Sequence, residues 1–176
     1  MKNLKKTKQC ILSLIAMLAF VSCINAQNDP PVVKQPNYHT AIGLRGGGTT
    51  GITIKQFFGE RNAMEGIFGF WTGGMSATVV YERHEPSTVS GLKWYYGAGA
   101  HVAFFDTKVF NSNFEQRYFR DYSGVGIGVD GIVGLEYKIL PIPFAISLDV
   151  KPFIEFNSTG SIIAAFDPSL GIKFTF

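Results

Sequence analysis

The chain has 176 residues, of which 46% are hydrophobic and 14% aromatic, with 16 Lys and Arg against 13 Asp and Glu. This length allows one domain or at most a small pair, and a composition so apolar and so low in charge excludes an intrinsically disordered chain. Two cysteines are too few to hold a small domain together by disulfides. The net charge of +3 would favour an anionic partner such as nucleic acid if the basic residues lay in the folded domain.

The basic residues are concentrated at the start of the chain. Four lysines and no acid lie in residues 1–8, and an apolar run follows over residues 10–21. That run is too short for a membrane-spanning helix, which needs about 20 residues. It is followed by a cleavage-like site that ends at Ala26, so we expect a signal peptide over residues 1–26. Lipidation at Cys23 is the alternative, because residues 20–23 resemble a lipobox.

Removal of the signal peptide changes the charge and the cysteine content. Residues 1–26 hold four of the 16 basic residues, none of the 13 acids and both cysteines, which leaves a net charge of −1. Nucleic acid is therefore not expected as a partner. Residues 27–37 contain three prolines and few apolar side chains, which predicts an extended periplasmic linker. Residues 38–176 remain as the folded domain.

The folded domain consists of short runs of alternating polar and apolar residues, separated by Gly, Pro and Asn. No stretch keeps the spacing of an amphipathic helix over three turns. The pattern predicts eight strands: Tyr38–Gly47, Thr50–Phe58, Ala63–Trp71, Met75–His84, Leu92–Phe105, Gly124–Ile139, Phe144–Phe156 and Phe166–Phe176.

An even number of strands would place both ends of the domain on one side, which we expect to be the periplasmic side. The opposite connections would then be 46–49, 71–74, 106–123 and 157–165. Only residues 106–123 form a long connection, and they mix charged with aromatic side chains. This loop is a candidate contact surface for a partner or a surface glycan, and the alternative is a lid or mobile loop without a dedicated ligand.

The two faces of each strand differ strongly. In Phe144–Phe156 one face is almost purely apolar, and the other carries Asp149, Lys151 and Glu155. The polar face of Gly124–Ile139 is rich in glycine, which suits the crowded inside of a narrow barrel better than a solvated surface. Aromatic residues gather at strand ends, as in the interfacial girdles of membrane barrels. They are Phe57, Phe58, Phe70, Trp71, residues 94–96, Phe104, Phe105, Phe144, Phe156, Phe174 and Phe176.

These observations predict an all-β protein, an eight-stranded antiparallel up-and-down transmembrane β-barrel with its apolar face toward lipid. A soluble, lipocalin-like carrier has the same alternation with the apolar faces turned inward, and it remains the alternative fold.

The last eight residues carry a specific motif. The segment from Ser169 to Phe176 has a polar residue, then Gly171, then Phe174 and Phe176, in the pattern of the C-terminal assembly signal of outer-membrane barrels. With the signal peptide and the eight strands, the sequence resembles the small eight-stranded outer-membrane β-barrel proteins of the OmpX and OmpA-barrel type. It resembles more narrowly a porin-like group with segments such as 81–84, 94–101, 130–137 and 148–152.

The resemblance covers residues 38–176 and implies a fold and a location, without a ligand. The location is the outer membrane of a Gram-negative cell envelope. The implied partners are outer-membrane lipid and the barrel assembly machinery, which would read Gly171, Phe174 and Phe176.

Charged residues recur on the face expected to point inward. Eight strands enclose an interior only wide enough for side chains, so these charges are expected to pair and close the lumen. A narrow gated path for small solutes is the alternative. The predicted interior network consists of Arg45, Lys55, Glu65, Glu82, His101, Asp130, Glu136, Asp149, Lys151, Glu155 and Lys173.

Motifs for catalysis and cofactor binding are weak. Residues 126–131 match G-x-G-x-x-G but lie inside a strand, so no dinucleotide cofactor is expected. The histidines lack metal-ligand spacing. Ser76 and His84 are separated by about 26 Å along an extended strand, too far for a dyad. His101 could face Asp130 across neighbouring strands, but no nucleophile is indicated, so a membrane-embedded lipid hydrolase or acyltransferase is the least favoured function.

Overall fold

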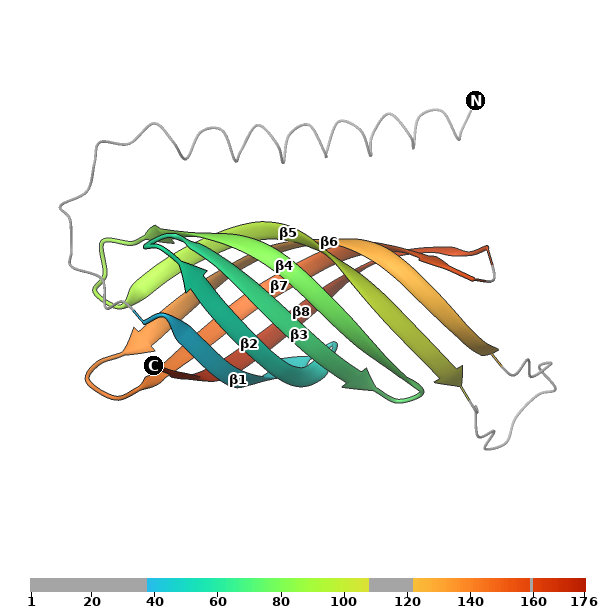
Figure 1. Ribbon diagram of the computed structural model, residues 1–176, viewed down its shortest axis with the longest axis horizontal. Coiled ribbons are helices and arrows are strands. Elements are labelled where there is room, and N and C mark those ends of the chain that lie inside the picture. The colour runs from blue at the N-terminus through green and yellow to red at the C-terminus, as the bar shows by residue number, and fades with distance from the viewer. Residues whose placement is uncertain (1–37, 108–121, 159) are drawn as a thin grey trace, which may run out of the picture. The chain divides into compact units, whose positions relative to one another are not determined.

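The protein forms one closed antiparallel barrel. The computed structural model describes residues 38–107, 122–158 and 160–176. Each strand pairs with the next in chain order, and β8 pairs with β1 (Figure 1). The strands are β1 (Thr40–Gly47), β2 (Thr50–Phe58), β3 (Asn62–Trp71), β4 (Gly74–Pro86), β5 (Leu92–Thr107), β6 (Tyr122–Ile139), β7 (Phe144–Asn157) and β8 (Ile162–Thr175). The predicted all-β, eight-stranded up-and-down barrel is confirmed.

Several expectations fall on other parts of the chain. The signal peptide, the lipidation site at Cys23, the linker and residues 108–121 of the long loop lie outside the described residues. Over the ranges that the structure does describe, no helix is long and apolar enough to cross a membrane.

The barrel has two different ends. We call the end that holds Thr40 and Thr175 the terminus end, where the turns β2–β3, β4–β5 and β6–β7 also lie. The opposite end, which we call the loop end, holds the remaining connections. Gly59 at the terminus end and Gly73 at the loop end have φ values of 86° and 87°, which only glycine adopts readily in such tight turns.

The start of β8 differs from the prediction. Residues 157–165 were expected to form an external connection, but β8 begins at Ile162 and pairs with β7 from there onward. The segment 162–165 reads Ile-Ile-Ala-Ala and does not alternate, so its strand character comes from the ladder with β7 and not from its own pattern.

The distribution of polar and apolar side chains is inverted relative to a water-soluble barrel. Buried polar or charged side chains outnumber buried hydrophobic ones among the described residues, whereas outward-facing positions are mostly large and apolar. The alternation follows the strand period of two, as in β2, where residues alternate between exposed and buried along the whole strand.

Four aromatic residues expected in the girdles lie on the inner face instead: Phe57 and Tyr95, which are buried, and Trp71 and Phe105 near the loop end. Phe57 and Tyr95 are 5% and 0% exposed, and they share the inner face of their strands with Lys55 and Lys93. Strand parity therefore prevails over the clustering of aromatics at strand ends, because neighbouring residues on one strand must face opposite sides of the sheet.

Inner-face glycines make room for large neighbours. A Cβ atom built at Gly134 would lie 2.6 Å from Cβ of Asp149 and 2.7 Å from Cζ of Tyr95. At Gly46, which faces outward near the loop end, an added Cβ would meet nothing within 4 Å. The Gly134 position is therefore what allows Tyr95 to lie across the lumen.

We expect Gly134→Ala to lower the free energy of unfolding by about 1–3 kcal/mol, since the new methyl group overpacks the interior. Gly46→Ala is the matched control and should stay within about 0.5 kcal/mol of the wild type. Urea unfolding of the folded barrel, followed by tryptophan fluorescence, measures both. Equal effects of the two substitutions would contradict the packing role of Gly134.

Candidate functional site

The candidate site is the charged interior of the barrel. The structure places all eleven residues of the predicted network on the inner face, each at most 7% exposed. It divides them into two groups. The first, which we call the Lys55 cluster, contains Lys55, Glu65, Glu82, Glu136 and Lys173. The second, which we call the loop-end cluster, contains Arg45, His101, Asp130, Asp149, Lys151 and Glu155, together with Asp167.

Lys55 is the centre of the first cluster. Its Nζ lies 2.8 Å from Oε2 of Glu65, 2.8 Å from Oε2 of Glu82 and 3.2 Å from Oε2 of Glu136. Lys173 approaches the same cluster from β8, with Nζ 2.9 Å from Glu65 Oε2 and 3.6 Å from Glu136 Oε2. These side chains come from five strands, so the cluster ties opposite walls of the barrel together.

An aromatic layer lies between the Lys55 cluster and the terminus end. The Tyr38 hydroxyl donates a hydrogen bond to Glu136, and its ring meets Phe57 edge-on with centroids 5.0 Å apart. His84 lies 4.8 Å from Phe57 by centroids, and its Nε2 is 2.9 Å from Oε2 of Glu82. Tyr38, Phe57 and His84 are all buried, so the polar cluster is covered by three rings on this side.

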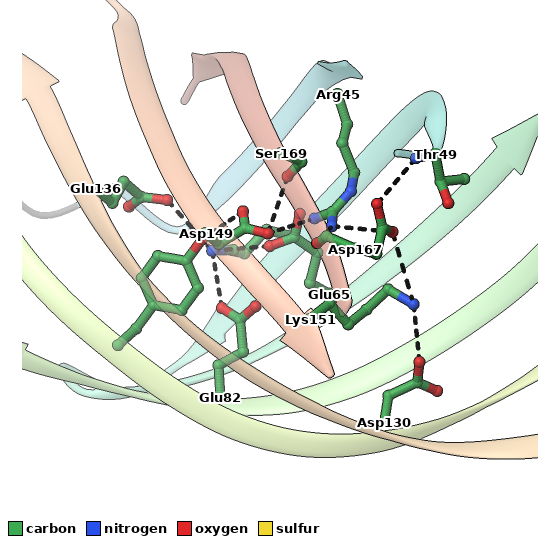
Figure 2. A network of polar contacts seen from close by, with 12 residues as sticks. Arg45, Thr49, Glu65, Glu82, Asp130, Glu136, Asp149, Lys151, Asp167 and Ser169 are labelled. Atoms are coloured by element: carbon green, nitrogen blue, oxygen red, sulfur yellow. Dashed lines mark hydrogen bonds and ion pairs between the residues drawn. The ribbon is translucent and has the colours of Figure 1, made fainter. Parts of the chain in front are cut away.

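The loop-end cluster is held by Arg45 and Lys151. An Nη of Arg45 lies 2.8 Å from Asp149 Oδ1, and the other lies 3.4 Å from Asp167 Oδ2. Lys151 Nζ lies 2.8 Å from Asp130 Oδ1 and 3.9 Å from Asp167 Oδ2. Figure 2 shows these contacts together with the hydrogen bonds from Ser169 and from the backbone of Thr49.

His101 lies between two carboxylates. Its Nδ1 is 2.7 Å from Asp130 Oδ2, and its Nε2 is 3.1 Å from Glu155 Oε2. Ser76 lines the same cavity as His101, but no hydrogen bond joins the two in the part of the chain that the structure describes. With both ring nitrogens engaged, His101 has none left to activate a serine hydroxyl. The arrangement supports a structural role for this histidine.

Tyr95 connects the two clusters. Its hydroxyl donates to Asp149 Oδ2 at 2.9 Å, and Lys55 Nζ lies 4.4 Å from the centre of its ring. His84 also stacks on the Tyr95 ring, with centroids 4.9 Å apart and planes 19° from parallel. One buried tyrosine thus receives a cation on its ring and donates to an anion, so it couples the halves of the lumen.

Some interior residues were missed by the sequence analysis. Asp167 accepts from the Thr49 backbone N–H at 2.9 Å and contacts both cations of the loop-end cluster, while Ser169 donates to Asp149 at 2.9 Å. Both lie on the inner face of β8, at odd-numbered positions shared with Gly171 and Lys173. Because alternate residues of a strand share one face, the inward position of Lys173 already predicts that Asp167 and Ser169 face inward as well. Lys93 faces Phe57, with Nζ 5.4 Å from the ring centre.

Carboxylates are in excess inside the barrel. Among the described residues, the buried acids are Glu65, Glu82, Asp130, Glu136, Asp149, Glu155 and Asp167. The buried lysines and arginine are Arg45, Lys55, Lys93, Lys151 and Lys173. Seven acids thus face five lysine and arginine side chains, and His101 adds a sixth cation when both of its ring nitrogens donate to carboxylates. In the loop-end cluster, four carboxylates face Arg45, Lys151 and His101.

No group of three or more His, Cys, Asp or Glu side chains in the described ranges is arranged to hold a metal ion. The acids of the lumen are bound instead to ammonium and guanidinium groups from other strands. The chemistry that this arrangement supports is charge pairing across a closed sheet.

Comparison with known proteins shows the fold. The chain is similar to the N-terminal β-barrel domain of OprF from Pseudomonas aeruginosa, a crystal structure, with a TM-score of 0.53 and 16% sequence identity. The match covers 78% of this chain and 95% of that domain. No protein-family model matches the sequence, and no curated protein matches it. The likeness therefore establishes the closed barrel and leaves the function to be argued from the residues.

We expect Lys55→Met to lower the free energy of unfolding by about 3–5 kcal/mol, because it leaves three buried glutamates without their shared cation. Arg61→Met is the control. Arg61 pairs with Glu85 at 3.1 Å on the surface, with its side chain 53% exposed, so its loss should cost at most about 1 kcal/mol. Urea titration of both variants checks this, and similar midpoints for the two would contradict the role of Lys55.

Proposed function

We propose that the protein is an integral β-barrel of the outer membrane with a largely closed, charged interior and a structural or interaction role, and that it is not an enzyme. The observation that carries the proposal is the inversion of the two faces. A soluble barrel buries its apolar side chains and exposes its charged ones, whereas here the charges are inside.

The outer surface is apolar over most of its height. Outward-facing side chains such as Ile127, Val129 and Leu170 are 65%, 58% and 59% exposed. Among the strand residues whose side chains the structure describes, the charged ones that face outward are Arg83 and Glu85, both close to the terminus end of β4. A continuous apolar surface of this extent is unfavourable in water and is the surface that a membrane barrel presents to lipid.

Aromatic residues at both ends of the outer surface support the same proposal. The outward aromatics at the terminus end include Phe58, Tyr96, Tyr137, Phe144, Phe174 and Phe176. Those toward the loop end are Phe68, Phe70, Phe104, Phe156 and Phe166. Such belts stabilise a barrel at the two membrane interfaces. A soluble lipocalin-like carrier would need these residues inside.

The pairing of the interior charges favours a structural plug over an open channel. A narrow gated path for small solutes is the second candidate, and one observation favours it. Lys55 and Lys173 each lie within reach of more than one glutamate, so they could change partners without passing through an unpaired state. A membrane-embedded lipid hydrolase is less favoured, because His101 is held by two carboxylates.

The C-terminal strand supports recognition by the barrel assembly machinery. Phe174 and Phe176 face outward with their centroids 6.0 Å apart, and Phe144 packs edge-on against Phe174. Before β8 pairs with β1, this strand is an exposed edge with an apolar face, which is a template for strand addition. Gly171 faces inward, where an added Cβ would collide with the Ser147 hydroxyl, so packing also accounts for this glycine.

We expect Val129→Arg to destabilise the barrel in lipid vesicles by about 2–4 kcal/mol, because Val129 lies near the middle of β6 on the outer face. Val89→Arg is the matched control in the β4–β5 turn and should change stability by no more than about 0.5 kcal/mol. Urea unfolding in vesicles measures both. If Val129→Arg were as mild as its control, the outer face would not be lipid-facing.

Cell fractionation tests the same proposal independently of stability. We expect the protein in the outer membrane and in solution only after detergent is added. Recovery in the soluble periplasm without detergent would contradict the proposed location.

Planar-bilayer recordings distinguish a closed lumen from a narrow gated path for small solutes. We expect no discrete conductance steps from the wild-type barrel, because both charge clusters cross the lumen. Tyr95→Ala, which removes the connection between them, should be more conductive than Phe58→Ala on the outer face. Clear single-channel steps in the wild type would favour the gated path instead.

A further inference from the structure

A cavity opens into the loop end of the barrel, above the loop-end cluster. Its volume is about 290 Å³, at the small end of the range for ligand pockets. Aromatic side chains that include Trp71, Phe105 and Phe153 form part of its wall, and Trp71 and Phe105 lie with centroids 6.0 Å apart. Its polar lining includes His101, Lys151, Glu155 and Asp167. The cavity thus combines an aromatic wall with a charged lining.

Two polar atoms of the loop-end cluster are buried without a hydrogen-bond partner among the described residues, Nε of Arg45 and Oε1 of Glu155, and of these two residues Glu155 lines the cavity. Asp130 accepts from Lys151 and His101, and Asp167 from Thr49 and Arg45, so both oxygens of each carboxylate have partners. Asp149 accepts from Arg45, Ser169 and Tyr95 with its two oxygens.

Glu155 is different. Its Oε2 is bound to His101, but its Oε1 is buried without a partner among the described residues, and the whole residue is 4% exposed. A buried carboxylate oxygen without a donor is unfavourable, so it indicates a missing donor and not a missing acceptor.

The charge balance also favours a ligand that donates hydrogen bonds, and in addition one that is positively charged. Four carboxylates in the loop-end cluster face Arg45, Lys151 and His101, which is a cation when both of its ring nitrogens donate, and all three already contact carboxylates. An added anion would find no cation without a partner, whereas an added cation would reduce the negative surplus. Aromatic faces in the wall also attract cations.

We propose that this cavity binds a small organic cation, a primary ammonium group carried on an apolar or aromatic body. The ammonium would donate to Glu155, and the body would pack against Trp71, Phe105 and Phe153. Oε1 of Glu155 lies against Gly126, 2.6 Å from where a Cβ would be, so binding requires the carboxylate to turn about its terminal bond, and this turn also moves Oε2 away from His101 Nε2. That torsion is broad in glutamate. The site goes beyond the proposed membrane role and does not depend on whether the lumen conducts.

The test uses the full barrel in non-ionic detergent and the two tryptophans as reporters. Trp71 lines the cavity, and Trp94 lies at the terminus end. We expect 2-phenylethylammonium to shift the indole N–H resonance of Trp71 saturably while that of Trp94 stays unchanged. The neutral 2-phenylethanol and the anion 3-phenylpropanoate should bind at least about tenfold more weakly.

Variants connect the binding to Glu155. Glu155→Gln should weaken binding of the ammonium by about tenfold or more, and Glu85→Gln at the terminus end should leave it unchanged. If Glu155→Gln does not fold, Ala165→Phe fills the cavity without removing a charge and should abolish the Trp71 shift. Equal binding of ammonium and alcohol, parallel shifts of both tryptophans, or binding unaffected by Glu155→Gln or Ala165→Phe would each overturn the proposal.

Discussion

The structure depends on one constraint, the pairing of charges inside a closed eight-stranded sheet. The lumen of such a barrel is only wide enough for side chains, and an isolated charge removed from water is strongly unfavourable. Lys55 meets this constraint through contacts with Glu65, Glu82 and Glu136. Because these partners come from different strands, the same contacts that neutralise the charge also connect the walls. Closure of the sheet and burial of the charges therefore stabilise each other.

Strand parity made the fold and the membership of the interior predictable from the sequence. Side chains alternate with a period of two, so a strand with one apolar and one charged face identifies its inner residues without a structure. The pairing of Lys55 with Glu65 could also be deduced, since they are direct partners in the β2–β3 ladder. Contacts across the lumen could not. Lys173 reaches Glu65 from β8, and this depends on strand tilt and barrel diameter.

The wrong expectations share one cause, a local signal that conflicts with the pairing of strands. Phe57 and Tyr95 belong to aromatic clusters at strand ends, yet parity turns both inward. Ile162 to Ala165 do not alternate, yet β7 extends β8 through them. For Phe57 and Tyr95 the alternation along their own strand decides, and for residues 162–165 the pairing with β7 decides. The type of a side chain indicates which face of the sheet it prefers, and its place in the paired strands determines which face it actually lies on.

The two ends of the lumen differ in their side chains, so a ligand would meet different groups at each end. Toward the terminus end, Tyr38, Phe57 and His84 cover the Lys55 cluster with a layer of buried rings. Toward the loop end, the charged side chains border a cavity whose wall is only partly aromatic. Tyr95 separates these regions while touching both, through its ring to Lys55 and its hydroxyl to Asp149. A ligand that entered from the loop end would therefore meet the carboxylate surplus first. The Lys55 cluster lies beneath this region and is connected to it through Tyr95, so contacts across the lumen support the floor of the cavity from below.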